Sequence, residues 1–325
     1  MALALSLSAS AFAQNDARDT AREGLADTLA KASQANALTI PLNPPIGTPF
    51  EYTVIIEKKR PKGDSRMELD QRLTFTRMGE GYTLDLDILA VSTGGGRLDL
   101  TDPEALAAMP ISARPFITSL DVELDASGEM VRVKDWPALS AMLSALPDEV
   151  ARRVQPERRE NAAAMAKELL APMLTASAED AAYILVKGWP SILGYGGTQL
   201  DAGAAYEAES QIGGDNAILP EPIPALVEFQ LSRTDQGDYL FEQSTTPDAE
   251  AMTVAMEAFI TRVQAMSEAK PDNDFEITDI SFVDALRVVF DQTSGLPTTA
   301  TLTRTTVVNG ATVGGEVITI TKAER

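Results

Sequence analysis

Apolar and polar residues alternate along much of the chain that follows residue 40. Between residues 69 and 88 the alternation runs on both sides of a glycine-containing turn, Gly79-Glu80-Gly81. Two such runs around a glycine-rich turn predict a β-hairpin with one apolar and one polar face. The run from Phe50 to Ile56 has the same character and predicts a neighbouring strand. The apolar positions of the predicted hairpin are Leu69, Leu73, Phe75, Tyr82, Leu84, Leu86 and Ile88.

The same pattern returns in the second part of the chain at a constant offset of 156 residues. GTPFE, which begins at Gly47, is matched by GAAYE from Gly203. LTFTRMGEGY, from Leu73, is matched by FQLSRTDQGDY from Phe229. Two separate stretches that keep one register predict a duplicated β-meander, and the two halves are expected to close over a shared core.

Apolar positions spaced three to four residues apart predict helices between the two halves. Asp135 is expected to cap a helix that ends at Pro147. Further helices are predicted from Pro156 to Leu170, before Pro172, and from Ser177 to Val186. Later elements are a predicted helix at 247–268 and strands near 281–291, 297–307 and 316–322.

These elements predict an α+β protein and not a doubly wound sheet, because the strands come as hairpins and do not alternate with helices. The expected architecture is two duplicated antiparallel β-meanders that form a curved sheet or open half-barrel with packed helices. The expected segments are a signal peptide (1–13), a flexible lead-in (14–40), a first meander (41–135), a helical connector (136–190) and a second meander (191–325) with the inserted helix 247–268.

The N-terminal stretch MALALSLSASAFAQ predicts export from the cytoplasm. It is apolar and rich in small residues, and Ala11-Phe12-Ala13 matches the A-x-A pattern that precedes a signal-peptidase cleavage site. A short buried helix is the alternative. No later run approaches the ~20 apolar residues that a membrane span requires. We therefore expect an exported protein that is cleaved near Ala13 and is periplasmic in a cell with two membranes.

The charge of the chain excludes some partners. Lys and Arg number 27 against 48 acidic residues, which gives a net charge of −21. Most of such a surface repels nucleic acids and anionic lipids. His and Cys are absent, which excludes disulfides, thiolate or Ser-His-Asp catalysis and ordinary zinc sites. This composition argues against an enzyme and predicts no cofactor, and only hard cations such as calcium suit the remaining ligand types.

Two clusters of Asp, Ser and Gly are candidates for chemistry. One is DASG at 125–128, and the other is DQTSG at 291–295. A carboxylate beside a hydroxyl could bind calcium or a sugar. The same residues suit tight turns, because Asp accepts hydrogen bonds from turn amides and Gly tolerates a positive φ. We interpret both clusters as hairpin turns.

Three other stretches resemble functional motifs but fail their requirements. DNDFEITD, at 272–279, lacks the Gly and the Glu that an EF-hand needs at its sixth and twelfth positions. The S-x-x-K match from Ser267 to Lys270 ends a predicted helix, whereas a catalytic Ser begins one. GYGGT, at 194–198, carries no P-loop Lys. We predict a solvated acidic loop, a helix end and a connection at these positions.

Methionines recur on the apolar sides of the predicted helices. Because Met side chains adapt to varied apolar shapes, such a seam can bind an apolar ligand. An ordinary helix core packed against a sheet is the alternative, and helices that move away from a concave sheet would combine the two. The predicted ligand-binding residues are Met142, Met252, Met256, Phe259, Val263 and Met266.

An exported chain with a curved antiparallel sheet, packed helices and no catalytic motif resembles the periplasmic lipoprotein carriers and related exported β-proteins. The resemblance is architectural, covers residues 45–322 as a pattern and includes no signature motif. It implies a concave face that holds acyl chains. We therefore hypothesise a non-enzymatic binding or carrier protein for a lipid or acyl chain. The alternatives are a structural protein that engages another envelope protein, and a hydrolase that uses carboxylates.

Overall fold

The computed structural model describes residues 36–59, 63–108, 119–186, 188–213, 221–266 and 280–323. The predicted signal peptide, the acidic loop at 272–279 and the stretch from Ser267 to Lys270 lie outside these residues. The described strands are β1 (Ala37–Thr39), β2 (Pro49–Lys59), β3 (Ser65–Met78), β4 (Gly81–Thr93), β5 (Gly96–Asp99), β6 (Leu120–Leu124), β7 (Met130–Val133), β8 (Gln199–Asp201), β9 (Ala205–Gly213), β10 (Pro222–Arg233), β11 (Tyr239–Pro247), β12 (Ile280–Phe290), β13 (Pro297–Val308) and β14 (Ala311–Lys322).

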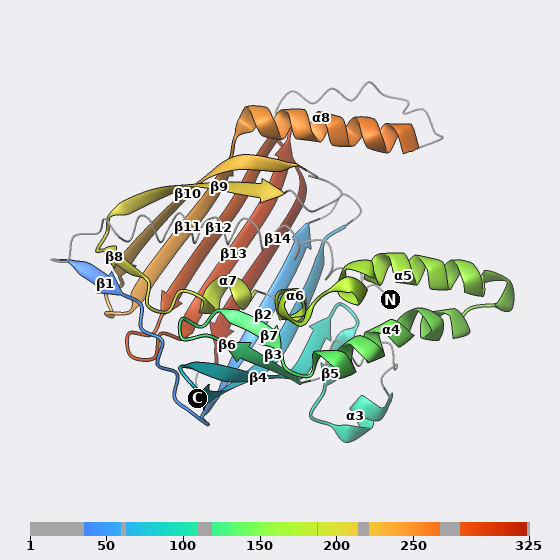
Figure 1. Ribbon diagram of the computed structural model, residues 1–325, viewed down its shortest axis with the longest axis horizontal. Helices are drawn as coiled ribbons and strands as arrows, with labels where there is room; N and C mark the ends of the chain where they lie inside the picture. Colours follow the sequence, from blue (N-terminus) through green and yellow to red (C-terminus); the bar gives the residue numbers. More distant parts are fainter. Residues whose placement is uncertain are drawn as a thin grey trace.

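Twelve of these strands form one antiparallel sheet, which is strongly curved and not closed (Figure 1). Its order is β7-β6-β4-β3-β2-β14-β13-β12-β11-β10-β9, and β5 pairs with β4 outside this order. The short strands β1 and β8 pair separately. The predicted α+β architecture with a curved, open antiparallel sheet is therefore confirmed.

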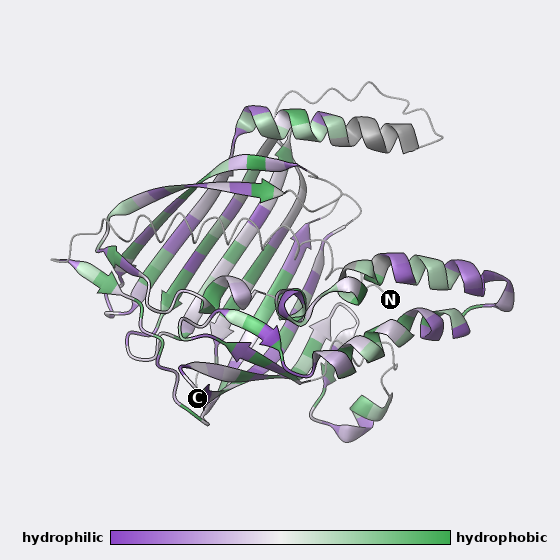
Figure 2. Ribbon diagram, viewed as in Figure 1, coloured by the Kyte–Doolittle hydropathy of each residue, from purple (hydrophilic) through white to green (hydrophobic). Residues whose placement is uncertain are grey.

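One face of the sheet, called the inner face below, carries the main apolar core. In β10, for example, every second residue from Ile223 to Leu231 is buried, and the residues between them are exposed or partly exposed. Figure 2 shows the resulting alternation of hydrophobic and hydrophilic positions along β10 to β14. Period-two alternation thus places one set of side chains on the inner face and leaves the other on the outer face.

The helices lie at three places relative to the sheet. The short helices α6 (Ala178–Leu185) and α7 (Pro190–Leu193) lie over the inner face, and α8 (Ala249–Met266) lies across one end of the strands (Figure 1). The helices α4 (Trp136–Arg152) and α5 (Arg159–Thr175) form a hairpin at the side, joined through the 3-10 helix η2 (Pro156–Arg158). A short helix, α3 (Pro103–Ala108), follows β5.

Two helix ends differ from the prediction that prolines terminate them. α4 continues past Pro147 to Arg152, and α5 continues past Pro172 to Thr175. A proline inside a helix removes one backbone hydrogen bond. Pro147 is buried on the packed side of α4 together with Leu146, so tertiary packing compensates for the lost bond.

The strand pairing agrees with the predicted duplication. Phe50 of β2 pairs with Leu73 of β3, and Tyr206 of β9 pairs with Phe229 of β10, so both strands keep the offset of 156. β2, β3, β4, β6 and β7 correspond to β9, β10, β11, β12 and β13 in the same spatial order. The two meanders therefore lie side by side in one sheet, and β14 joins them by pairing with β2 and β13.

Trp189 anchors the segment between α6 and α7 to the inner face. Its indole N–H donates a hydrogen bond to Oε1 of Gln71 at 2.7 Å, and its ring meets that of Tyr52 edge-on, with 4.8 Å between the centroids. Trp189 and Gln71 are both buried, so this bond satisfies two polar groups in the core. Gly188 has a φ of 82°, and a Cβ there would come within 3.3 Å of Ile318, so the backbone itself packs on β14.

The segments that lead into the two meanders tie the halves together. Each of them reaches a turn of the other half: the amide of Gly196 donates to the carbonyl of Ser127 at 3.0 Å, and the amide of Asn43 donates to the carbonyl of Ser294 at 2.9 Å. Ser127 lies between β6 and β7, on the side of the sheet opposite to β9. The hydrogen bond between Gly196 and Ser127 therefore connects the segment that leads into the second meander with the opposite side of the open sheet.

Candidate functional site

α8 covers one end of the inner face and brings part of the predicted methionine seam there. Its contact with the sheet is a small apolar group, called the α8 cluster below, which is distinct from the main core. The buried members are Ile212, Ile223, Ala225 and Met252, and the partly buried members are Ala251, Ala255, Met256 and Phe282. Met252 is only 3% exposed, so this end of the seam packs against the sheet.

Asp248 fixes the start of α8 to β10. Its backbone amide donates to the carbonyl of Pro224 at 2.7 Å, and its Oδ1 accepts a hydrogen bond from the amide of Ala251 at 2.8 Å. The second bond is an N-cap, which satisfies a free amide of the first helical turn. Phe259, Val263 and Met266 belong to α8, but their side chains lie outside the described residues.

Met142 is not brought to α8. It lies on α4, is 41% exposed and belongs to neither apolar group. Figure 1 shows α4 and α8 in separate parts of the molecule. The structure thus places Met252 and Met256 together and Met142 elsewhere, and a role of these residues in ligand binding stays a prediction.

Four charged residues cross the inner face on adjacent strands, and the last of them, Asp284, adjoins Phe282 of the α8 cluster. They are Lys58 on β2, Glu316 on β14, Arg304 on β13 and Asp284 on β12, and the strand register places each beside the next. Lys58 Nζ lies 3.0 Å from Oε1 of Glu316. Nη2 and Nε of Arg304 donate to Oδ2 of Asp284 at 2.7 and 3.1 Å. This inner-face charged row alternates in sign from one strand to the next.

The inner-face charged row borders the main core on one side and meets the α8 cluster only at β12. On the side of the main core, the same four strands present Ile56, Ile318, Leu302 and Leu286, none of them more than 8% exposed. On the other side, Phe282 of β12 belongs to the α8 cluster, and the next inward positions of β13 and β14 are Thr306 and Gly314. The side chains of the row are between 12% and 22% exposed. Water therefore reaches the level of the row, whereas the adjoining layer of the main core is dry.

Charges on an inward face are costly, because two ions lose hydration there and regain it only through good pairing. A search for sequence motifs does not find the row, because its members lie on four different strands. Its signal in the sequence is a charge in an inward position of the alternation, as for Asp284 between Phe282 and Leu286. Only the strand pairing shows that these positions are neighbours.

The two Asp/Ser/Gly clusters form turns, which confirms the prediction. Oδ1 of Asp125 accepts hydrogen bonds from the amides of Ser127 and Glu129 and from the Ser127 hydroxyl, at 2.7–2.9 Å. Oδ1 of Asp291 accepts from the amide and hydroxyl of Ser294 at 2.7 and 2.6 Å. Both carboxylates are thus hydrogen-bonded within their own turns. The two turns occupy equivalent positions in the two meanders.

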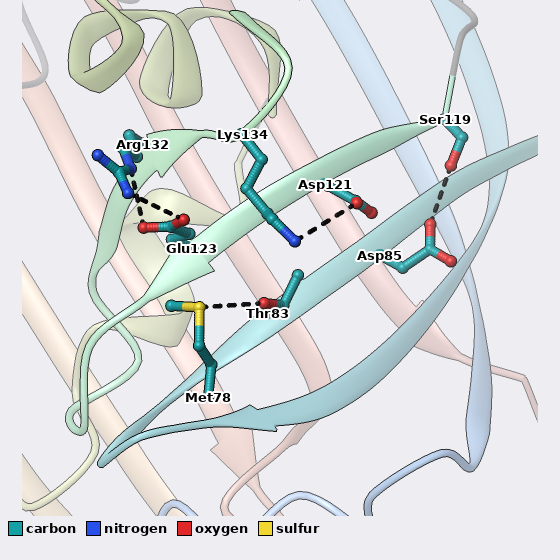
Figure 3. Close-up of polar contacts among 8 residues, drawn as sticks. All are labelled: Met78, Thr83, Asp85, Ser119, Asp121, Glu123, Arg132 and Lys134. Carbon is teal, nitrogen blue, oxygen red and sulfur yellow. Dashed lines mark hydrogen bonds and ion pairs between the residues drawn. The ribbon is translucent and has the colours of Figure 1, made fainter.

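The outer face carries ion pairs in which at least one partner is well exposed: Arg132 is 53% exposed, although its partner Glu123 is only 13% exposed. Figure 3 shows Arg132 of β7, whose Nε and Nη2 donate to Glu123 of β6 at 2.8 and 3.1 Å. Beside it, Lys134 lies 4.0 Å from Asp121, and both of these side chains are 40% exposed. Exposed pairs of this type contribute little to stability, and they provide a reference for the inner-face charged row.

Asp85 is an outer-face carboxylate whose environment perturbs its pKa. Burial raises its pKa, the charges of Asp87 and Asp121 raise it further, and the hydrogen bond from Ser119 opposes them (Figure 3). A carboxylate hydrolase uses two carboxyl groups on either side of a bound substrate, whereas Asp85 lies on an open sheet face. In the described part of the chain, no group of three or more acidic side chains could hold a metal ion.

Comparisons with known proteins add no family. A scan against protein families finds no match for this chain, and a search of curated proteins finds none either. Among the described helices, none is long and apolar enough to cross a membrane. The candidate site therefore rests on the geometry of the inner face, where the charged row and the α8 cluster meet.

Proposed function

We propose that this protein is a non-enzymatic binding or carrier protein for an amphiphilic lipid or acyl chain, which it holds between α8 and the inner face. The observation that carries the proposal is that α8 rests on a small apolar cluster of its own, distinct from the main core. We therefore expect α8 to leave the sheet without opening the core around Trp189.

The residues under α8 suit an apolar ligand. Displacement of α8 uncovers Ile212, Ile223 and Phe282 on the sheet and Met252 and Met256 on the helix. Methionine side chains adapt to acyl chains of different shape. The predicted export signal at residues 1–13 agrees with a place in the periplasm, where lipids and acylated proteins must cross an aqueous space.

Native mass spectrometry tests this function directly. The protein is produced with its own leader, recovered from the periplasm and transferred intact into the gas phase. The expected spectrum contains a bound species with the mass of a lipid. A second assay measures the fluorescence of N-phenylnaphthylamine, which rises when this dye enters an apolar site. Absence of both a lipid adduct and dye binding would contradict the proposal.

A reversible clamp tests the part that α8 plays. The chain contains no Cys, so Ala225→Cys and Ala251→Cys place two unique thiols in the α8 cluster. Joining them with a short, cleavable thiol crosslinker is expected to abolish dye binding, and cleavage is expected to restore it. The Ala251→Cys variant treated in the same way is the control. Equal binding in the clamped and cleaved forms would show that the ligand does not enter beneath α8.

One observation favours a second candidate function, interaction with another envelope protein. Met142 on α4 and Met165 on α5 are 41% and 57% exposed, although both are large and apolar. Exposed apolar side chains on neighbouring helices are typical of interaction surfaces when they form a patch. Affinity capture from an envelope extract, with Met142→Gln and Met165→Gln combined as the comparison, tests this alternative.

A further inference from the structure

The inner-face charged row indicates the chemical class of the headgroup of the proposed ligand. This inference rests on the proposed function. We infer that the row binds a zwitterionic headgroup, in which an ammonium and a phosphate are joined by a short linker. Phosphoethanolamine and phosphocholine lipids have such headgroups. The acyl chains then lie beneath α8.

The spacing of the charged row fits this headgroup. Its members lie on adjacent strands, so neighbouring positions are about 4.8 Å apart along the row. Arg304 lies between the two carboxylates, and Glu316 lies between the two cations. A headgroup laid along the row can therefore direct its phosphate to a cation and its ammonium to the adjacent carboxylate. The hydrogen-bonding groups of the row are already oriented by their mutual pairing.

The net charge of the row provides the selectivity. Two cations and two carboxylates sum to zero, so a purely anionic headgroup gains one cation but also approaches Glu316 or Asp284. Like charges that meet in a partly dry site repel strongly, because screening by water is reduced. The exposed fraction of these side chains, 12–22%, indicates such a partly dry site. A zwitterion avoids the repulsion and satisfies both signs.

The two sides of the row decide where the acyl chains go. On the side of the main core the row adjoins Ile318, which is 2% exposed, and this packing leaves the adjoining layer dry. On the opposite side the row meets the α8 cluster at one strand, where Phe282 follows Asp284 at the next inward position of β12. A lipid whose headgroup lies on the row therefore directs its chains away from the main core and past Phe282 towards α8.

Displacement of N-phenylnaphthylamine by short-chain diacyl lipids tests the inference. Four lipids with identical chains carry phosphocholine, phosphoethanolamine, phosphoglycerol or a bare hydroxyl group. For the wild-type protein we expect the two zwitterionic lipids to displace the dye at roughly tenfold lower concentration than the other two. The double variant Lys58→Met, Glu316→Gln is expected to keep dye binding and to lose this preference.

Two controls separate the row from general effects of charge. Lys134→Met with Asp121→Asn makes the same change of charge at an exposed pair of the outer face and is expected to keep the preference. Lys58→Glu with Glu316→Lys reverses one pair at constant net charge and is expected to keep both folding and preference. If the variant Lys58→Met, Glu316→Gln does not fold, the comparison of the four lipids on the wild-type protein still tests the inference.

The outcomes distinguish the inference from the function on which it rests. Equal displacement by all four lipids would overturn the zwitterionic headgroup and leave the lipid-binding function standing. A preference that survives Lys58→Met, Glu316→Gln would show that the headgroup lies elsewhere. Failure of the wild-type protein to bind the dye would contradict the proposed function itself.

Discussion

The two helical coverings of the inner face differ in how firmly they are attached. The segment between α6 and α7 is held by Trp189, which is fully buried and hydrogen-bonded to the buried Gln71. α8 rests on a small apolar cluster of its own, which is distinct from the main core. The contrast teaches that two coverings of one sheet can serve different purposes. The first completes the core, and the second is, under the proposed function, the one that exchanges its contacts for a ligand.

The largest expected effect comes from removing the anchor of the first covering. Trp189→Ala empties a fully buried position and leaves Gln71 without its donor, so we expect the free energy of unfolding to fall by about 4 kcal/mol. Urea unfolding followed by circular dichroism measures the loss. Trp189→Phe is the control, since it keeps part of the volume and should cost less. A fall in the free energy of unfolding of less than about 1 kcal/mol would show that Trp189 does not attach the first covering more firmly than α8 is attached.

A smaller effect is expected in the inner-face charged row. Glu316→Gln leaves the partly buried Lys58 without its carboxylate, which should cost roughly 2 kcal/mol. The matched control is Glu123→Gln on the outer face, whose partner Arg132 is 53% exposed. That change should cost at most about 1 kcal/mol. Equal losses in chemical denaturation would mean that the inner and outer ion pairs have the same environment.

The Asp291 turn between β12 and β13 should respond to acid. Burial acts to raise the pKa of Asp291, but hydrogen bonds from Ser294 and Thr293 outweigh it, and the pKa lies below its usual value. Because the folded-state pKa is lowered, the carboxylate contributes stability above its unfolded pKa of about 3.9 and loses it as pH falls through the folded value. Asp291→Asn should therefore cost roughly 1 kcal/mol at pH 7 and flatten the loss of stability below pH 4.

Thermal unfolding at a series of pH values measures this difference. Asp235→Asn, in the exposed turn between β10 and β11, is the control for the loss of one acidic group. The hydrogen-bonding argument for Asp291 fails if both variants show the same dependence on pH.

The smallest effect on overall stability is expected in the second covering. Met252→Ala weakens the α8 cluster, and we expect the free energy of global unfolding to change by less than about 1 kcal/mol because α8 opens locally. Hydrogen exchange of residues 249–258 should accelerate, and dye binding should weaken. Met165→Ala, at a site that is 57% exposed, should change neither. A fall of about 3 kcal/mol in the free energy of global unfolding would show that α8 unfolds together with the main core, and the two coverings would then not differ.

Local patterns in the sequence were sufficient to predict the meanders and their turns. The offset of 156 between the repeats survives in the pairing of Phe50 with Leu73 and of Tyr206 with Phe229. Helix ends were less predictable: Pro147 was expected to end α4, but its burial among apolar neighbours keeps it within the helix. Such packing comes from residues distant in the chain, which a local pattern does not include.

The sequence by itself determined which residues form strands and turns, because alternation at period two and turn-forming residues act within a few neighbours. Only the tertiary structure decided which charges meet, since Lys58 and Glu316 become neighbours through the pairing of β2 with β14. It also separated Met142 from Met252, although both lie on helices with the same apolar character. The physical reason is that contacts between elements depend on strand order and helix placement, which the alternation of apolar and polar residues does not encode.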